Sequence, residues 1–211
     1  QVMKIKYRIN PVFSELIPSA LSACDGILFD SCSSCPHCRG RLVGYDVKTK
    51  HFADVIDGSG TKPVIVRIKR FRCSECGAIG YADQPFYPKT RAGSPVVDLC
   101  VVLSASMPYA RAATTLMQFG VNVDRWSVRN YAKNIPGRIP SAELYGIVLP
   151  VSVISLAALT FNKGCDTTIG ASDVLNACGY PSSQKSADTL EKLSDIKEID
   201  YTRFFPSLCC D

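Results

Sequence analysis

The residues of this chain with the clearest capacity for chemistry are cysteines arranged in two short motifs. The first reads Cys35-Pro36-His37-Cys38-Arg39-Gly40 and the second reads Cys73-Ser74-Glu75-Cys76-Gly77, and 34 residues lie between Cys38 and Cys73. Each C-x-x-C turn brings two thiolates together, and the glycine that follows lets the backbone fold around an ion. Two such turns supply the four sulfur ligands of a structural, tetrahedral zinc site. We therefore predict that Cys35, Cys38, Cys73 and Cys76 bind Zn²⁺.

Other assignments of these cysteines stay open on the sequence alone. Cys32 forms a further C-x-x-C pair with Cys35, and His37 could supply a nitrogen ligand. The proline and glycine of the Cys35 motif fit a tight turn better than Ser33-Ser34 does, which favours Cys35 with Cys38. The same thiolates could hold iron in a rubredoxin-like site, or could pair as disulfides in an oxidising compartment.

The composition predicts a globular chain in a reducing environment. The chain has 211 residues, 46% of them hydrophobic, which is enough for a substantial core. Eleven cysteines would suit a secreted scaffold, but the opening residues, with Lys4, Lys6 and Arg8, lack the apolar run of a signal peptide. We therefore expect a cytoplasmic protein with free or metal-bound thiols.

Charge is distributed unevenly along the chain. Residues 1–137 contain 18 Lys and Arg against 10 Asp and Glu, whereas residues 138–211 contain 6 against 9. A basic segment that also carries a metal motif favours a polyanionic partner, because cations that neutralise phosphates release counterions.

The first half of the chain predicts a small sheet around the cysteines. Residues 42–47 are expected to form a strand that leaves the first motif, and residues 48–62 are expected to form a loop around the Asp57-Gly58-Ser59-Gly60 turn signal. A second strand begins at Val64 and alternates with period two into Cys73, and residues 78–86 are expected to return as a third strand. The prolines and glycine of residues 85–93 then indicate a linker. The second strand carries four cations that could contact DNA, namely Arg67, Lys69, Arg70 and Arg72.

Three short helices are expected next. Ser94 is predicted to cap the first and Pro95 to occupy its first turn, Pro108 opens the second before Gly120 ends it, and Asp124 caps a third that extends to about residue 135. Helices of this length joined by tight turns suggest a helix-turn-helix.

The third of these helices has two distinct faces. Its apolar residues recur at the spacing of one buried stripe, and its cations recur every four residues on another face. A recognition helix would use such a face to meet phosphates and base edges. The predicted DNA contacts are Arg125, Ser127, Arg129, Asn130 and Lys133.

Three segments together carry a family resemblance: Cys35-Pro36-His37-Cys38, the Arg-rich run 66–77 and Trp126-Ser127-Val128-Arg129-Asn130-Tyr131. They resemble the N-terminal DNA-binding region of prokaryotic insertion-sequence transposases, over roughly residues 31–137. In that family a zinc ribbon, whose second cysteine pair follows an Arg-rich strand, precedes a helix-turn-helix that binds the terminal repeats of the element. The resemblance implies a zinc-dependent interaction with DNA.

The remaining residues do not match a transposase nuclease domain. An RNase H type core needs a β-rich fold with three spaced carboxylates, and Asp166, Asp173 and Glu191 are better interpreted as helix caps and surface groups. The uncharged stretch from 144 to 162 approaches the length of a membrane span. A helix that starts at Pro150 would be too short to cross a bilayer, so we expect a buried helix in a helical C-terminal region.

The sequence thus predicts an α+β protein in four parts: an N-terminal segment (1–30), a β-rich zinc ribbon (31–92), a helix-turn-helix (93–137) and a small helical C-terminal module (138–211). The predicted function is zinc-dependent binding of double-stranded DNA without catalysis. We expect no interaction with a membrane and no small-molecule substrate. The sequence is compatible with a homodimer. The alternatives are an active transposase fragment, a zinc-stabilised protein-interaction module and a rubredoxin-like iron protein.

Overall fold

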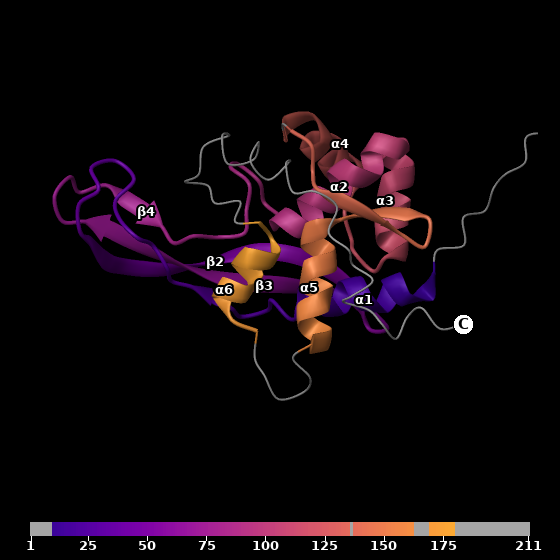
Figure 1. The fold of residues 1–211 in the computed structure, drawn as a ribbon, viewed down its shortest axis with the longest axis horizontal. Coiled ribbons are helices and arrows are strands. Elements are labelled where there is room, and N and C mark those ends of the chain that lie inside the picture. Colours follow the sequence, from indigo (N-terminus) through magenta and orange to yellow (C-terminus); the bar gives the residue numbers. More distant parts are fainter. Residues whose placement is uncertain (1–9, 136, 163–168, 180–211) are drawn as a thin grey trace, which may run out of the picture.

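The computed structural model describes residues 10–135, 137–162 and 169–179, and over these residues the protein is a mixed α+β structure (Figure 1). A long hairpin runs through the molecule, with helices around one end and the other end projecting from them. The sequence also predicts a strand at residues 4–9, and that segment lies outside the described residues. The elements are α1 (Pro11–Ser22), β1 (Leu28–Phe29), β2 (Leu42–Asp57), β3 (Gly60–Cys73), β4 (Ile79–Tyr81), α2 (Ser94–Ser106), α3 (Tyr109–Gln118), α4 (Arg125–Asn134), β5 (Ser141–Leu144), β6 (Ile147–Pro150), α5 (Val151–Asn162) and α6 (Ala171–Ala177).

Strands β2 and β3 form the central antiparallel hairpin. They pair from Leu42 opposite Cys73 to Asp57 opposite Gly60, and the backbone N–H of Ser59 donates to Asp57 Oδ1 at 2.8 Å in the turn. The predicted loop over residues 48–62 is therefore wrong outside this turn. Pairing with β3 satisfies the backbone of residues 48–56, and that long-range ladder outweighs the polar composition that indicated a loop.

The hairpin has two halves with different surroundings. Residues 43–49 of β2 are exposed on both faces, whereas Phe52, Ala53 and Val55 are buried among the helices. On the projecting half, β4 pairs with β3 at the edge and covers only Ile79–Tyr81 of the strand predicted at 78–86. At Ala82 the chain turns into the core, because the following residues are held there by aromatic packing.

The segment predicted as a linker is part of the core. Phe86 is fully buried and meets Phe52 edge-on, with ring centroids 5.9 Å apart. An ideal Cβ at Gly93 would lie 2.3 Å from the Phe52 ring, and the Gly93 N–H donates to the Phe52 carbonyl at 2.8 Å. Gly93, and not the predicted Ser94, is the N-cap of α2. A glycine is required there because the aromatic ring occupies the position of any side chain.

Helices α2, α3 and α4 match the predicted bounds closely. Gly120, at φ +74°, ends α3, and the Asp124 carboxylate caps α4 by accepting from the N–H groups of Trp126 and Ser127. Helix α4 contacts both α2 and α3, and it buries Val128 and Tyr131 against them. The apolar stripe expected on this helix is thus confirmed.

The C-terminal region is less helical than expected. Residues 141–150 form the β5–β6 hairpin, where the prediction had only helices. Helix α5 begins directly after Pro150 and contacts α1, α2 and α6, as a buried helix should. In the described residues, no helix combines the length and hydrophobicity needed to cross a membrane. The sequence also predicts a helix from residue 183 to about residue 199, and that segment lies outside the described residues.

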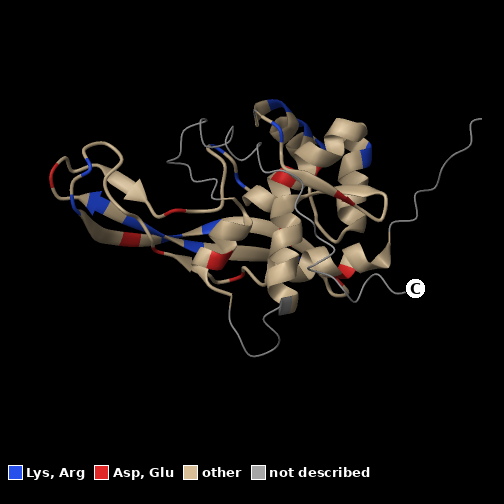
Figure 2. Cartoon of the chain, in the orientation of Figure 1, with Lys and Arg blue, Asp and Glu red and all other residues tan. Residues whose placement is uncertain are grey.

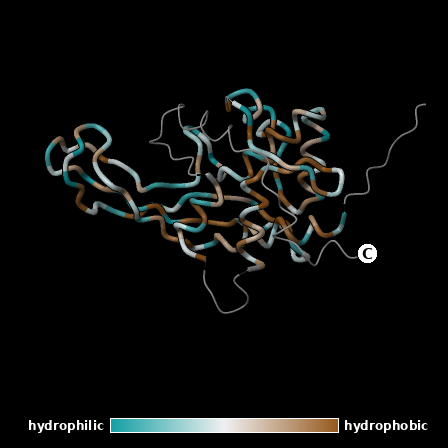
Figure 3. The backbone as a smooth tube through the Cα atoms, in the orientation of Figure 1, coloured by the Kyte–Doolittle hydropathy of each residue, from teal (hydrophilic) through white to brown (hydrophobic). Residues whose placement is uncertain are grey.

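One hydrophobic cluster unites all of these segments, including Phe13, Phe52, Leu99, Val128 and Leu156. Figure 3 shows that hydrophobic residues are concentrated where the helices meet the hairpin. The domain boundaries predicted from the sequence stay predictions.

The core contains a buried carboxylate at Asp98 of α2. The Tyr87 hydroxyl donates to its Oδ1 at 2.6 Å and the Ser152 hydroxyl donates to its Oδ2 at 2.5 Å. Burial nevertheless raises the pKa of Asp98 to about 6. The effect of desolvation on this pKa therefore outweighs the effect of the two hydrogen bonds. The same bonds connect α2 to α5 and to the segment that precedes α2.

We predict that Asp98 makes folding stability fall as pH rises. An acid whose folded pKa lies above its unfolded value binds more protons when folded, so the contribution of Asp98 to stability is largest below pH 4 and is lost as the pH rises through 6. The loss, by about 3 kcal/mol, should be absent from Asp98→Asn. Urea titrations of both proteins between pH 4 and 7.5 measure this difference, and parallel curves would contradict it.

Candidate functional site

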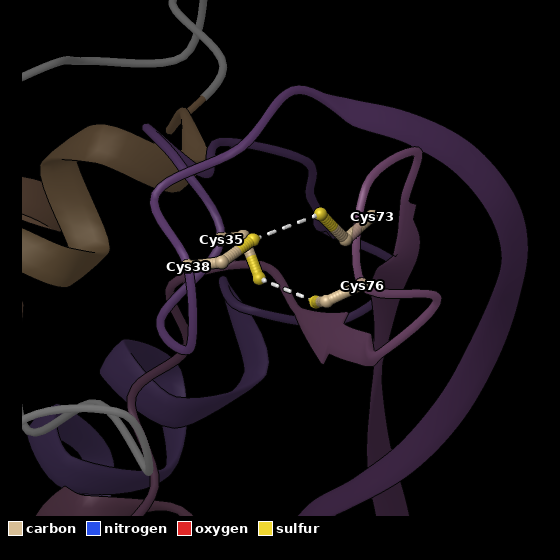
Figure 4. Close-up of side chains that lie close together, drawn as sticks. All are labelled: Cys35, Cys38, Cys73 and Cys76. Carbon is tan, nitrogen blue, oxygen red and sulfur yellow. Dashed lines mark hydrogen bonds between the residues drawn. The ribbon is translucent and has the colours of Figure 1, made fainter.

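Four cysteines meet at the projecting end of the hairpin. Cys35 and Cys38 come from the loop before β2, Cys73 ends β3, and Cys76 lies in the turn before β4 (Figure 4). Their sulfur atoms all lie within 4.8 Å of one another. The Sγ atoms of Cys35 and Cys76 are 3.6 Å apart, and those of Cys38 and Cys73 are 3.4 Å apart.

The two turns have matching backbone geometry. In the first, the Arg39 N–H donates to the Cys35 carbonyl at 2.8 Å, and in the second, the Gly77 N–H donates to the Cys73 carbonyl at 3.1 Å. Arg39 and Gly77 occupy equivalent left-handed positions, at φ +60° and +72°. A glycine adopts the left-handed conformation only in the second turn, as predicted. In the first turn Arg39 adopts it instead.

Contacts between the turns hold them face to face. Ser74 donates to the Arg41 carbonyl through both its N–H, at 3.0 Å, and its hydroxyl, at 3.1 Å. The Glu75 side chain lies across Gly40, where an ideal Cβ would be 2.6 Å from the Glu75 Cδ. A side chain at residue 40 would therefore displace the flexible end of Glu75.

The tetrad is suited to binding a metal ion. Sulfur ligands about 2.3 Å from a tetrahedral zinc ion are about 3.8 Å from one another, close to the separations seen here. The pKa of Cys73 is lowered to about 7, chiefly because backbone N–H groups of Cys76 and Glu75 donate to its sulfur. Deprotonation is thereby favoured at Cys73, and the thiolate is the form that binds metals. Contacts with the neighbouring cysteine side chains raise the pKa of Cys38 and, together with burial, that of Cys76.

Cys32 and His37 lie outside this cluster. The Cys32 thiol is half-buried and donates to the Ser34 carbonyl at 3.9 Å, and burial raises its pKa. His37 is exposed and is not among the four clustered ligands. Of the pairs that the sequence left open, the structure brings together Cys35 with Cys38 and Cys73 with Cys76.

The predicted contacts on α4 lie on its exposed side. Arg125 and Arg129 both approach the ring of Trp126, with guanidinium carbons 5.3 and 5.6 Å from its centroid, and 64% of Trp126 is exposed. Lys133 is exposed in the last turn. The two arginines and Trp126 thus lie close together on the exposed side of α4, and Figure 2 shows basic positions on this helix.

Two polar residues of α4 are committed to local bonds. The Ser127 hydroxyl donates to Asp124 Oδ2 at 2.6 Å, so it belongs to the helix cap. Asn130 Oδ1 accepts from Asn134 Nδ2 at 2.6 Å. Either side chain would have to exchange these bonds before it contacted a ligand.

The four cations of β3 differ in their surroundings. Arg70 forms a two-pronged ion pair with Asp46, which lowers the pKa of that carboxyl. Arg67 is exposed and its Nε donates to the Gly26 carbonyl at 3.1 Å, Lys69 lies over the Phe71 ring, and Arg72 is exposed at the end of the strand.

The carboxylates considered for catalysis are not assembled in the described part of the chain. Asp173 accepts a hydrogen bond from the Gly170 N–H at 3.0 Å and so caps α6. Asp166 and Glu191 lie outside the described residues.

Comparisons with protein-family models, with curated proteins and with solved structures found no match for this chain.

Sequence reasoning missed the apolar surface around the cysteines. Val43, Tyr45, Ile79 and Tyr81 are exposed on the strands beside the tetrad. The sequence predicts only a strand over residues 42–47, although a short hairpin with no covering layer must leave such side chains in solvent.

We predict that Cys73→Ser abolishes metal binding, from about one ion per chain to nearly none, because three thiolates form a much weaker site. The projecting strands should then fray while the helical signal in circular dichroism persists. Elemental analysis of the purified protein measures the metal. Cys32→Ser is the matched control and should retain it, whereas metal loss in Cys32→Ser together with retention in Cys38→Ser would identify a different ligand pair.

Proposed function

We propose that this protein binds double-stranded DNA through a helix-turn-helix, with a zinc ribbon as a metal-stabilised accessory module. The proposed recognition element is α4, preceded by α3 as the supporting helix. The proposal includes no catalytic step, and it follows the resemblance of residues 31–137 to transposase DNA-binding regions.

The main support is the division of α4 into two faces. Val128 and Tyr131 are packed into the core, while Arg125, Arg129 and Lys133 are exposed along the opposite side. Burial of one face fixes the orientation of the helix, so the cations are presented outward on a rigid element. A helix presented in this way fits the major groove, where arginine reads guanine and lysine contacts phosphate.

Zinc is the metal that best suits four thiolates in two C-x-x-C turns. Its proposed role is structural, since all four positions would be occupied by protein ligands and none would remain for a substrate. The projecting half of the hairpin has little core of its own, so metal binding would supply much of its folding free energy. Iron would give the purified protein an absorption band in the visible range, which separates the two metals.

The first test is selection of bound sequences from a pool of random duplexes. Enrichment of a common site would support the proposal, and the enriched site becomes the probe for variants. Absence of any salt-dependent affinity for duplex DNA would refute it and favour a protein-interaction module.

We predict distinct effects for two substitutions in α4. Arg129→Ala should weaken binding to the preferred duplex by about 1–3 kcal/mol and relax the sequence preference, because a base contact is lost. Lys133→Ala should weaken all duplexes alike and reduce the salt slope by about one unit. Fluorescence anisotropy at several salt concentrations measures both effects. Lys62→Ala, which removes an exposed cation from β3, is the control and should leave sequence preference unchanged.

A further inference from the structure

A second candidate surface lies beside the cysteine tetrad, on one face of β2, β3 and β4. We define it as the tip face, and its members are Val43, Tyr45, Arg70, Arg72, Ile79 and Tyr81. The exposed fraction is 53% for Val43, 52% for Tyr45, 44% for Ile79 and 37% for Tyr81. The left end of Figure 3 shows apolar and polar segments alternating there, well away from the main core.

Strand pairing places these residues on one face. Val43 and Ile79 are the cross-strand neighbours of Arg72, and Tyr81 is the neighbour of Arg70. Residues directly opposite in an antiparallel pair share a face, so the three strands contribute to one surface. An irregularity in β2 between Gly44 and Asp46 adds Tyr45 to it.

Arg70 fixes the two tyrosines relative to each other. Its guanidinium carbon lies 5.2 Å from the Tyr45 ring centroid and 5.9 Å from that of Tyr81. The ion pair with Asp46 holds the guanidinium in place. The result is a preorganised pair of aromatic rings that keep a large exposed fraction.

The charge around the tip face is positive. Residues 41–48, 70–76 and 79–81 contain four cations, namely Arg41, Lys48, Arg70 and Arg72, against two carboxylates, Asp46 and Glu75, and Asp46 is paired with Arg70. Figure 2 shows basic segments on this end of the hairpin. An open hollow of about 530 Å³, lined by Val43, Tyr45, Arg72 and the second cysteine turn, adjoins the face. A matching ligand would combine flat apolar rings with negative charge.

We propose that the tip face binds single-stranded DNA, with bases stacked on Tyr45 and Tyr81 and phosphates near Arg72 and the neighbouring cations. Aromatic platforms in a positive groove are the usual means of binding single strands, because unpaired bases offer their ring faces. Bases within a duplex are already stacked on one another. A second copy of the chain fits less well, since a symmetric contact would bring the arginines of both copies together.

This inference rests on the proposed function for its choice of DNA as the ligand, and it adds a contact separate from α4. Its test uses the full, metal-loaded chain and a labelled oligothymidine of about 15 nucleotides, within the site sizes of such proteins. Tyr45→Ala and Tyr81→Ala should each weaken oligothymidine binding by about fivefold or more. Tyr45→Trp should retain it, since a ring remains to stack on.

Matched controls separate this face from others. Val47→Ala removes an exposed side chain from the same strand, but Val47 pairs with Lys69 on the opposite face, and affinity should not change. Arg129→Ala should weaken duplex binding and leave oligothymidine binding as it was. Metal content measured for each variant confirms that the tip is folded.

Several outcomes would overturn the inference. These are no binding of oligothymidine by the unmodified chain, equal losses in Val47→Ala and Tyr45→Ala, or a clear preference for oligouridine. A dimer that dissociates in Tyr45→Ala, with unchanged oligothymidine affinity, would assign the face to a second copy instead. Duplex binding without single-strand binding would refute this inference alone, and the reverse result would refute the proposed role of α4 alone.

Discussion

The contact between Phe52 and Gly93 determines how the two main parts of the protein are joined. Phe52 belongs to the buried half of β2, and Gly93 is the residue on which α2 begins. Their approach is so close that the ring occupies the space of a side chain at residue 93. Since α4 packs on α2, the orientation of its exposed face relative to the sheet depends on this contact. Any larger residue at position 93 would therefore change the orientation of the helices relative to the sheet before it changed the helices or the sheet themselves.

The hairpin is stabilised differently at its two ends. At the buried end, Val55, Val64 and Val66 contribute to the common core. At the projecting end, both faces of β2 are in solvent, and the cysteine tetrad lies where a core would otherwise be needed. Small modules that bury little apolar surface depend on metals or disulfides for stability. In the proposed function, the metal-bound tetrad substitutes for hydrophobic burial at this end.

Local signals explain what could be predicted from the sequence. The C-x-x-C turns, Asp124 as a cap and Gly120 as a helix end each depend on residues within one turn, and the structure contains all of them. Long-range packing explains what could not. Residues 48–56 form a strand because β3 is available to pair with them, and Phe86 and Gly93 of the predicted linker are buried because Phe52 packs on them. The β5–β6 strands, at four residues each, are too short for a periodic pattern.

The separation in sequence between packing partners has a consequence for synthesis of the chain. The end with the four cysteines needs only residues 35–81, all of which are close along the chain. Helix α1, in contrast, contacts α5, which begins at Val151. The hydrogen bond to Asp98 likewise cannot form until Ser152 has been synthesised. Contacts between distant residues form late, because loop closure must come first. We therefore expect the cysteine turns to come together early on the ribosome, while the apolar side of α1, which also contacts β2, stays incompletely covered until α5 has emerged.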